Sequence, residues 1–478
     1  MQKCDYDKPQ MNVARKRTKS TTEVVNFVIP ASVIGKGIGK KYKMLTYGCQ
    51  ANESDSEKIG GLLEIIGFSL TTDDSKADLI VLNTCAIRAN AENKVFGELG
   101  RLKKYYKANP DLIIAIGGCM PQEEVVVEKI IKTYPQVKII FGTHNFHQLP
   151  ELLEKALKDN QRVIKVLSEE GSIVEMMPTI RTSQSKAWVD IIYGCDEFCT
   201  YCIVPYTRGK ERSRKPEFII SEVNKLIEEG YHEVTLLGQN VNSYGLDFTD
   251  CEYNFANLLE DLAKLPIERI RFTTSHPKDF SDSLIAVLAK ETNLMPAIHL
   301  PVQSGSNRIL KAMNRKYTKE SYIELVDKIY QAIPDVSLTT DIIVGFPGET
   351  ESDFLETIAL VEHCQFEGAY TFVFSPRSGT PAASFDDVIP MDEKMQRLYR
   401  LNEVINRGFA RGNQRFVGQI VKILVDGISK GNSDVLSGYS EHNKLVNFRG
   451  SLSLVGTIVD VKITDAKTWS LFGELVNE

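Results

Sequence analysis

The strongest constraint on the fold is an alternation of apolar strands with amphipathic helices. Over residues 41–157, apolar runs alternate with helical stretches: the runs are 41–47, 77–85, 111–119 and 137–142, and the helices are 56–68, 90–108 and 123–134. Apolar strands that are connected through helices form a parallel sheet with helices on its faces. The sequence therefore predicts a doubly wound α/β domain over residues 41–157.

A second alternation covers residues 187–410. Its six strand candidates are 187–192, 233–238, 269–274, 297–302, 338–345 and 369–374. Six strand–helix units predict a partial (βα)6 parallel barrel, whose active site would lie at the C-terminal ends of the strands. From residue 413 to residue 478, short strands separated by Gly, Asn and Asp turns predict a small all-β barrel.

The remaining segments and the composition limit where in the cell the protein can act and which partners it can bind. Residues 1–40 are polar, with a basic run from Arg15 to Lys19, and are predicted to be a flexible tail; residues 158–186 are predicted to be a connector. The net charge of -6 gives no global basic signature, so nucleic acid would have to meet local basic patches. No apolar stretch reaches the roughly 18 residues of a membrane helix, and the N-terminus has no apolar signal region. We therefore expect a cytoplasmic protein whose cysteines are metal ligands, catalytic groups or buried thiols rather than disulfides.

Three cysteines after the first barrel strand form the most specific motif. Cys195, Cys199 and Cys202 have the spacing Cys-x3-Cys-x2-Cys, which lets one short loop present three thiolates to an iron–sulfur cluster. Three thiolates bind three irons of a 4Fe-4S cluster and leave the fourth iron open. The alternatives are a zinc site, which lacks a nearby fourth ligand, and a thiol redox pair of Cys199 and Cys202, which leaves Cys195 unexplained.

The predicted sheet places a second trio of cysteines close together. Cys49, Cys85 and Cys119 each end a predicted parallel strand, and such strand ends meet at the sheet edge where ligands collect. Gly48, Gly117 and Gly118 would allow close backbone approach. We therefore predict a second cluster, again with one free iron; the alternative is three buried free cysteines. We assign no role to the remaining cysteines, which are Cys4, Cys251 and Cys364.

The first trio, with an aromatic residue before its third cysteine, resembles the signature of the radical S-adenosylmethionine (SAM) enzymes. Four strand-ending segments, 236–245, 273–277, 299–306 and 341–349, are similar to the turns that hold SAM in that superfamily. The resemblance implies SAM contacts from Tyr201, Gly238, Gln239, Ser275, Gln303, Ser304 and Gly345. No catalytic residue is assigned beyond the cluster ligands.

Two cysteine trios in a chain of these three domains resemble the methylthiotransferases. That resemblance implies two 4Fe-4S clusters, two SAM per turnover and a C-terminal RNA-binding TRAM domain. The basic residues that could contact RNA there, or lie solvated on the surface, are Lys422, His442, Lys444 and Arg449. After the cluster loop, the candidates for phosphate contact are Arg208, Lys210, Arg212 and Arg214, with a solvated basic loop as the alternative.

The residues around Cys49 indicate the type of methylthiotransferase. TYGCQANESDSEKI, with Gln50 and Asn52, looks like the type that adds a methylthio group to carbon 2 of N(6)-dimethylallyladenosine beside the tRNA anticodon. The alternatives are the types for threonylcarbamoyl-adenosine of tRNA and for a ribosomal protein, and a non-enzymatic iron–sulfur RNA-binding protein. The resemblance also implies an electron donor such as flavodoxin or ferredoxin, a sulfur donor and a monomer.

Overall fold

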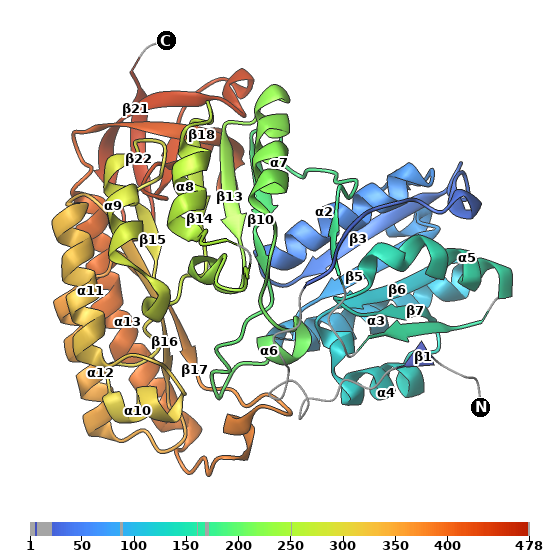
Figure 1. Cartoon of the computed structure of the whole chain (residues 1–478), viewed down its shortest axis with the longest axis horizontal. Helices are drawn as coiled ribbons and strands as arrows, with labels where there is room; N and C mark the ends of the chain where they lie inside the picture. The colour runs from blue at the N-terminus through green and yellow to red at the C-terminus, as the bar shows by residue number, and fades with distance from the viewer. Residues whose placement is uncertain are drawn as a thin grey trace.

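The computed structural model places three regions side by side (Figure 1). The structure describes residues 5–6, 22–86, 89–159, 161–167, 172–249 and 251–476. An α/β domain forms the right side of Figure 1, a half-barrel the left side, and a small β-barrel caps the half-barrel at the top. The predicted fold class is therefore confirmed.

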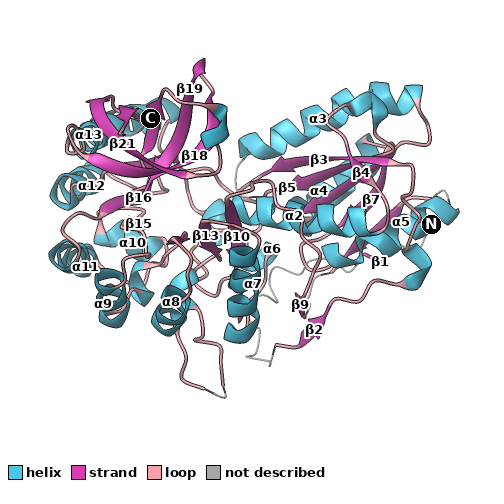
Figure 2. Cartoon of the chain, turned by 90° about the horizontal axis from the view of Figure 1, so that it is seen from above, coloured by secondary structure: helices cyan, strands magenta, loops and turns pink. Residues whose placement is uncertain are grey.

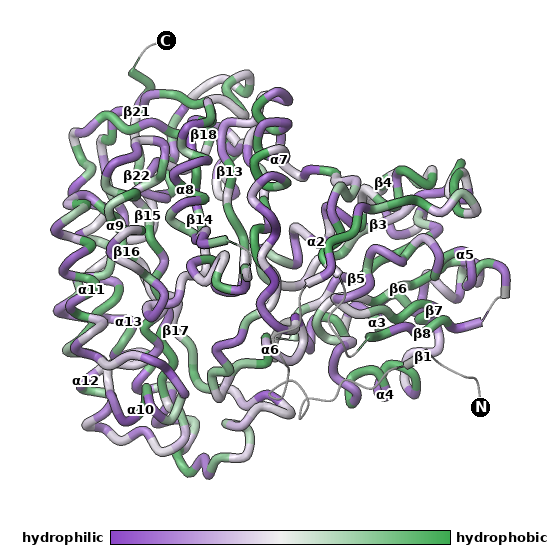
Figure 3. Tube along the Cα trace, in the orientation of Figure 1, coloured by the Kyte–Doolittle hydropathy of each residue, from purple (hydrophilic) through white to green (hydrophobic). Residues whose placement is uncertain are grey.

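The N-terminal domain contains one parallel sheet of seven strands in the order β1-β8-β7-β6-β5-β3-β4. The strands are β1 (Asp5–Tyr6), β3 (Lys41–Tyr47), β4 (Ser69–Leu70), β5 (Leu79–Thr84), β6 (Ile113–Gly118), β7 (Val137–Phe141) and β8 (Val163–Val166). The central strands are apolar along their length, as the green tube at β6 and β7 shows in Figure 3. Strands buried on both faces read as such continuous apolar runs.

Helices cover both faces of this sheet. They are α2 (Gln50–Ile65) and α5 (Leu149–Asp159) on one face, and α3 (Ala89–Ala108) and α4 (Glu124–Thr133) on the other. The chain order reverses direction between β3 and β5, because β4 pairs outward from β3 while β5, β6 and β7 continue the other way. Ligands of doubly wound folds bind at such a switch point.

The predicted tail and connector are partly built into this domain. β2 (Val24–Asn26) pairs with β9 (Ile173–Glu175), and β8 adds a strand to the main sheet. Val33 of the 3-10 turn η1 (Ala31–Val33) is fully buried. A flexible tail is therefore the wrong expectation for residues 22–40, because strands of two to four residues are too short to show a period. The basic run from Arg15 to Lys19 lies outside the described residues.

The half-barrel contains the six predicted parallel strands. They are β10 (Lys186–Asp190), β13 (Glu233–Leu237), β14 (Arg269–Phe272), β15 (Ala297–His299), β16 (Ser337–Val344) and β17 (Gly368–Val373). The first three and the last three strands pair among themselves, and the bridge between Ile270 and Leu294 continues the sheet beyond β14.

An outer layer of helices covers these strands, as Figure 2 shows from above. The helices are α7 (Pro216–Glu228), α8 (Phe255–Ala263), α9 (Asp282–Lys290), α10 (Asn307–Ala312), α11 (Lys319–Ala332), α12 (Glu351–Cys364) and α13 (Met391–Gln414). Val234, Leu236, Ile270 and Phe272 belong to the apolar core of this region. Because side chains alternate along a strand, Glu233, Thr235, Arg269 and Arg271 point to the other face.

The C-terminal region is a closed five-stranded barrel in the order β18-β19-β20-β22-β21. Its strands are β18 (Ile420–Ser429), β19 (Asn432–Ser440), β20 (Leu445–Phe448), β21 (Ile458–Ala466) and β22 (Leu471–Leu475). Val425, Val446 and Phe448 lie in its apolar core. None of the helices among the described residues combines the length and the apolar character that crossing a bilayer requires.

This barrel is docked on the N-terminal ends of the half-barrel strands. At the start of β14, Arg269 donates to the backbone carbonyls of Tyr439 and Lys422 at 2.9 and 2.8 Å. Lys444 pairs with Glu367 at 2.8 Å, next to the start of β17. His442 Nε2 lies 2.9 Å from an Asp335 carboxylate oxygen. The C-terminal ends of the strands therefore stay clear of the barrel.

Two predicted RNA contacts are wrong for this reason. His442 and Lys444 are buried in the contact with the half-barrel, where they pair with Asp335 and Glu367 of the half-barrel. Lys422 and Arg449 are exposed and remain candidates for contact with RNA. The sequence shows the charge of a lysine or histidine but not the carboxylate that a distant segment brings to it.

Candidate active site

The loop with Cys195, Cys199 and Cys202 follows β10 and the short strand β11 (Ile192–Tyr193). The Cys195 N–H donates to the Gly209 carbonyl at 3.0 Å, and the Cys202 N–H donates to the Cys199 carbonyl at 2.9 Å. Gly194 has φ +76°, and a Cβ there would lie 2.0 Å from the Lys210 carbonyl oxygen. Glycine is therefore required where the loop meets its own returning segment.

Cys199 is buried, Cys195 and Cys202 are partly buried, and the three thiols lie close enough together that the pKa values of Cys195 and Cys202 are raised. Burial, Glu211 and the other two cysteines raise the pKa of Cys195 well above its ordinary value. Burial and then Cys199 raise the pKa of Cys202 to about 12. Crowded buried thiolates need a compensating positive centre, and a bound metal centre supplies one. Three such donors on one loop fit the three protein ligands of an iron–sulfur cluster.

Arg315, which the sequence analysis missed, contacts this trio. Its Nη1 lies 3.3 Å from Cys199 Sγ, while its other nitrogens donate to the Pro301 carbonyl at 3.0 Å and to the Tyr317 hydroxyl at 2.8 Å. These contacts fix the guanidinium in one orientation. Arg315 follows α10 in a segment without a recognisable motif, so no local signal in the sequence distinguishes it.

Several buried polar atoms at the neighbouring strand ends have no hydrogen-bond partner among the described residues. These atoms are Asn240 Oδ1, Ser275 Oγ, His276 Nε2 and Glu211 Oε1. Buried polar groups are normally paired, so each such atom needs an explanation. They belong to the turns after β13 and β14 and to the segment that returns from the cysteine loop. A ligand with hydroxyl, amino and carboxylate groups, as SAM has, fits this set.

His276 is a hydrogen-bond donor in this group. Burial, then the charges of Arg315 and Lys278, lowers its pKa to about 2, so the imidazole is neutral. Its Nδ1 accepts from the Lys278 N–H at 3.3 Å, which places the remaining proton on Nε2. That Nε2–H has no full hydrogen bond in the protein, since the nearest Glu197 carboxylate oxygen is 3.8 Å away.

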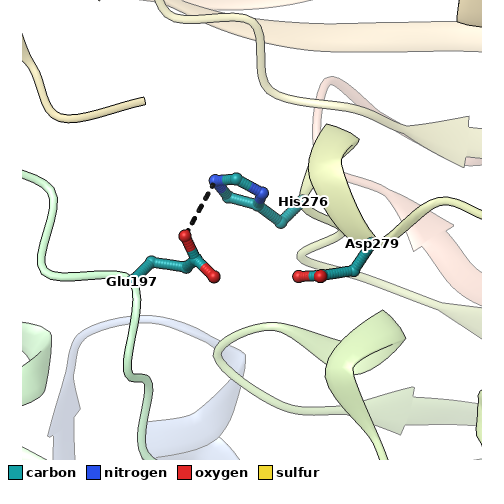
Figure 4. A group of neighbouring side chains, drawn as sticks. All are labelled: Glu197, His276 and Asp279. Atoms are coloured by element: carbon teal, nitrogen blue, oxygen red, sulfur yellow. Dashed lines mark ion pairs between the residues drawn. The ribbon is translucent and has the colours of Figure 1, made fainter. Parts of the chain in front are cut away.

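Glu197, His276 and Asp279 point toward one another (Figure 4). Their potential ligand atoms lie within 4.8 Å of one another, as those of a metal site would. However, the Lys278 ammonium pairs with Glu197 and lies 3.5 Å from Asp279, so both carboxylates already have a cation. We therefore assign this group to the polar wall of the ligand site rather than to a metal.

The other predicted SAM residues differ in what they contact. Tyr201 lies beside Cys199, Cys202 and Arg315, and packs with Phe346 and Phe374. Gln303 is buried in the left-handed region at φ +70°, where its backbone links to β16. A non-glycine residue in that region is held by its surroundings and is often found at ligand sites. Gln239 lies half-buried in the turn after β13.

Three predicted contacts have structural explanations instead. The Ser304 hydroxyl lies 3.4 Å from Thr357 Oγ1 on α12, in the helical layer. A Cβ at Gly238 would lie 2.4 Å from Ile192, and one at Gly345 would lie 2.5 Å from Lys394. Close packing therefore accounts for these two glycines, and the structure does not support side-chain contact of Ser304 with SAM.

Cys49, Cys85 and Cys119 occupy equivalent positions at one edge of the N-terminal sheet. Cys85 and Cys119 follow β5 and β6 directly, and Cys49 follows β3 after Gly48. The last residues of these strands, Tyr47, Thr84 and Gly118, lie in register across β3, β5 and β6. Cys49 also caps α2. This edge contains the switch point between β3 and β5, where ligands of doubly wound folds bind.

Asn52 connects the end of β3 to the end of β5. Its side-chain oxygen accepts from the Cys49 N–H at 3.4 Å, and its Nδ2 donates to the Thr84 carbonyl at 3.2 Å. A Cβ at Gly48 would lie 2.2 Å from the Asn52 side chain, and one at Gly118 would lie 2.4 Å from the Thr84 carbonyl oxygen. The glycines therefore permit the close approach that their positions predict.

The half-barrel segment that follows Cys202 packs against the N-terminal trio, with Ile203 and Tyr206 in one apolar cluster with Cys119. Arg208, which follows the short helix α6 (Val204–Thr207) after Cys202, lies near both Cys119 and Cys49. Burial raises the pKa of Cys119, and the Arg208 guanidinium opposes that rise. The half-barrel residue Arg377 lies close enough to Cys85 to interact electrostatically with it.

Most of the predicted phosphate contacts are therefore wrong. Arg208, Arg212 and Arg214 are all buried. Arg208 Nη2 pairs with Asp55 at 2.7 Å, and Arg214 pairs with Glu175 at 2.6 Å and with Glu222 at 2.8 Å. Lys210 is half-buried. Arg208 joins the half-barrel to the N-terminal domain, and Arg214 joins it to β9, instead of facing solvent.

Comparison with known families agrees with this architecture. The radical SAM superfamily matches residues 189–361, the uncharacterized protein family UPF0004 matches residues 41–142, and the TRAM domain matches residues 414–476. The fold and the cysteine loop together define the chain as a radical SAM protein, a class that uses SAM and a 4Fe-4S cluster.

Relatives with high sequence identity show to which family of radical SAM proteins the chain belongs. A tRNA-2-methylthio-N(6)-dimethylallyladenosine synthase of Geobacillus kaustophilus is 56% identical over 99% of this chain and 91% of its own length. The protein of the same name from Bacillus subtilis is 55% identical over 99% of this chain and 93% of its own length. The chain belongs to the family of tRNA-2-methylthio-N(6)-dimethylallyladenosine synthases.

Among solved structures, the radical SAM methyltransferase TsrM from Kitasatospora setae, bound to tryptophan and a SAM analogue, is similar with a TM-score of 0.53. It is 13% identical, and the match covers 72% of this chain and 75% of that chain. At this identity the likeness supports the arrangement of the domains and carries no statement about substrate.

Proposed function

We propose that this chain adds a methylthio group to carbon 2 of N(6)-dimethylallyladenosine next to the anticodon of tRNA. One observation carries the proposal: the segment that follows one cysteine trio packs against the other trio, in a chain that is 56% identical to an enzyme of that name. A radical SAM core needs only the trio at Cys195, Cys199 and Cys202. The trio at Cys49, Cys85 and Cys119 adds a second metal site next to it.

The proposed cofactors are two 4Fe-4S clusters, one on each trio, and two SAM per turnover. Cys195, Cys199 and Cys202 would hold the cluster of the half-barrel, which would supply the one-electron chemistry for reductive cleavage of SAM and so for removal of the carbon 2 hydrogen. In this proposal Asn240, Ser275 and His276 orient SAM with their free polar atoms. Tyr201 packs beside it, and the apolar surroundings of the loop exclude water.

The inner face of the half-barrel offers a place for the adenosine. His299, Asp341 and Tyr370 alternate with buried core residues along β15, β16 and β17, and all three are partly or largely exposed. His299 contacts the other two, with its Nε2 3.4 Å from Asp341 and its ring centroid 5.8 Å from that of Tyr370. An anticodon-loop base is suited to such a site, because single-stranded bases are the least costly to splay out.

The remaining partners follow from this chemistry. We propose a one-electron donor such as flavodoxin or ferredoxin, a sulfur donor, and a chain that acts as a monomer in the cytoplasm. The C-terminal barrel would hold the RNA through exposed residues such as Lys422 and Arg449.

Nucleoside mass spectrometry of tRNA from a deletion strain tests the proposal. We expect N(6)-dimethylallyladenosine to accumulate without its 2-methylthio form, and the chain to restore that form. Loss of the methylthio group from threonylcarbamoyl-adenosine or from a ribosomal protein would instead identify one of the two related activities. Anaerobic reconstitution should give about eight iron atoms per chain, since each 4Fe-4S cluster holds four, and about four would remove the second cluster.

A further inference from the structure

Arg208 connects the segment after Cys202 to the N-terminal domain through a buried ion pair. It follows Cys202 by six residues, yet its Nη2 lies 2.7 Å from Asp55 Oδ2 in the N-terminal domain. Asp55 belongs to α2, the helix that Cys49 caps. Both side chains are buried, at 8% and 4% exposure. The guanidinium is therefore held in place from both sides of the domain contact.

The same guanidinium also faces the N-terminal thiols. It lies close enough to Cys119 and Cys49 to interact electrostatically with both, in addition to its pair with Asp55, and the preceding residues Ile203 and Tyr206 pack against Cys119. A buried charge is tolerated when it is paired and hydrogen-bonded. Asp55 supplies one negative charge, and a cluster bound to the trio would present further negative charge to the guanidinium.

We propose that Arg208 and Asp55 set the reduction potential of the cluster on Cys49, Cys85 and Cys119. This inference rests on the proposed function, in which that trio binds a 4Fe-4S cluster. Charge and hydrogen bonds next to the cluster ligands tune the potential of such centres. Arg208 stabilises the reduced form, which carries one more negative charge, and Asp55 opposes it. Both are positioning residues, since they act through the ligand sulfurs.

The alternative is that the pair only clamps the two domains. The two roles predict different results for the two variants. A clamp is lost equally when either partner is removed, whereas the two charges shift the reduction potential in opposite directions. Removal of the guanidinium charge should make the cluster harder to reduce, whereas removal of the carboxylate charge should make it easier to reduce. Arg208→Gln and Asp55→Asn remove these charges with little change in side-chain volume.

The test is a redox titration followed by electron paramagnetic resonance on the full-length chain. A background with alanine at Cys195, Cys199 and Cys202 leaves the N-terminal cluster as the source of the signal. We expect Arg208→Gln to lower the equilibrium constant for reduction of the cluster about tenfold, which is a fall of about 59 mV in reduction potential for a one-electron couple. Asp55→Asn should raise the same constant by a similar factor. Arg208→Lys, which keeps the charge, should lie between Arg208→Gln and the parent.

Arg181→Gln is the matched control. Arg181 joins the same two domains, with its Nη1 3.2 Å from Glu57 on α2 and its Nη2 2.7 Å from Glu222, and the contacts that hold it involve no cysteine. It should leave the potential unchanged. Shifts of the same sign in Arg208→Gln and Asp55→Asn, no shift in either, or loss of iron from both would overturn the proposal. A parent without a reducible N-terminal cluster would instead refute the proposed second cluster itself.

Discussion

Nη1 of Arg315 lies 3.3 Å from Sγ of Cys199, so a fixed positive charge accompanies the cysteine loop of the half-barrel. Arg315 is held by the Pro301 carbonyl and the Tyr317 hydroxyl, and its ring contact with Tyr317 spans 5.0 Å from the guanidinium carbon to the ring centroid. Each cysteine trio thus has an arginine beside one of its thiols: Arg315 is hydrogen-bonded to Cys199, and Arg208 interacts electrostatically with Cys119.

Arg315→Gln should slow the reductive cleavage of SAM by about 10- to 100-fold, because a hydrogen bond to a charged group contributes about 1.5–3 kcal/mol. The measurement is anaerobic formation of 5′-deoxyadenosine by enzyme with a measured iron content. Lys316→Gln changes the exposed neighbour and should leave the rate unchanged. A normal rate in Arg315→Gln with a full iron content would show that the contact is dispensable.

Cys49→Ala should abolish methylthiolation and leave SAM cleavage intact. Cys49 belongs to the N-terminal trio, while the polar atoms that we assign to SAM lie on the half-barrel. Iron should fall from about eight to about four atoms per chain, which is one cluster. The checks are iron analysis, 5′-deoxyadenosine formation and nucleoside analysis of the tRNA product. Cys251→Ala, at an exposed cysteine, is the control, and loss of both activities in Cys49→Ala would contradict separate roles for the trios.

Most of what the sequence could predict comes from two patterns. One is the spacing of apolar residues along strands and helices, and the other is the position of cysteines at the ends of parallel strands. Four strands of the half-barrel, β10, β13, β16 and β17, have five to eight residues and are long enough to show their apolar pattern. The parallel sheet brings Cys49, Cys85 and Cys119 to one edge although 34 to 36 residues separate them. The partners of charged side chains were not predictable. Arg208 finds Asp55 and Lys444 finds Glu367 only after distant segments have packed together.

His276 predicts a pH-dependent component of stability. Its pKa is about 2 in the folded protein and about 6.5 when the chain is unfolded, so the unfolded state binds the extra proton as pH falls. This component is fully present above pH 6.5 and is lost below it. At pH 5.5 the loss amounts to about 1.4 kcal/mol relative to the stability at pH well above 6.5.

His276→Asn keeps an acceptor for the Lys278 N–H and removes the titrating ring. Thermal unfolding at pH 7.5 and 5.5 should therefore show a larger loss of melting temperature for the parent than for the variant. His363→Asn, at an exposed histidine on α12, is the control and should follow the parent. Equal pH dependence of the parent and His276→Asn would refute the assignment of a neutral, buried imidazole.

Arg449→Gln should weaken tRNA binding without affecting SAM cleavage in the absence of RNA. Arg449 lines a hollow on the C-terminal barrel together with Asn447 and Phe472, on a surface that the half-barrel leaves open. If Arg449 contacts a phosphate, its loss should weaken binding several-fold and reduce the slope of log affinity against log salt by about one.

This substitution is a sharper test than deletion of residues 413–478. Deletion would also remove the carbonyls of Lys422 and Tyr439 from the buried guanidinium of Arg269, and so destabilise the half-barrel. Binding should be measured by titration of labelled tRNA at several salt concentrations. Lys430→Gln, on the exposed turn between β18 and β19, is the matched control and should bind like the parent. An unchanged affinity and salt slope for Arg449→Gln would exclude this face of the barrel from the RNA interface.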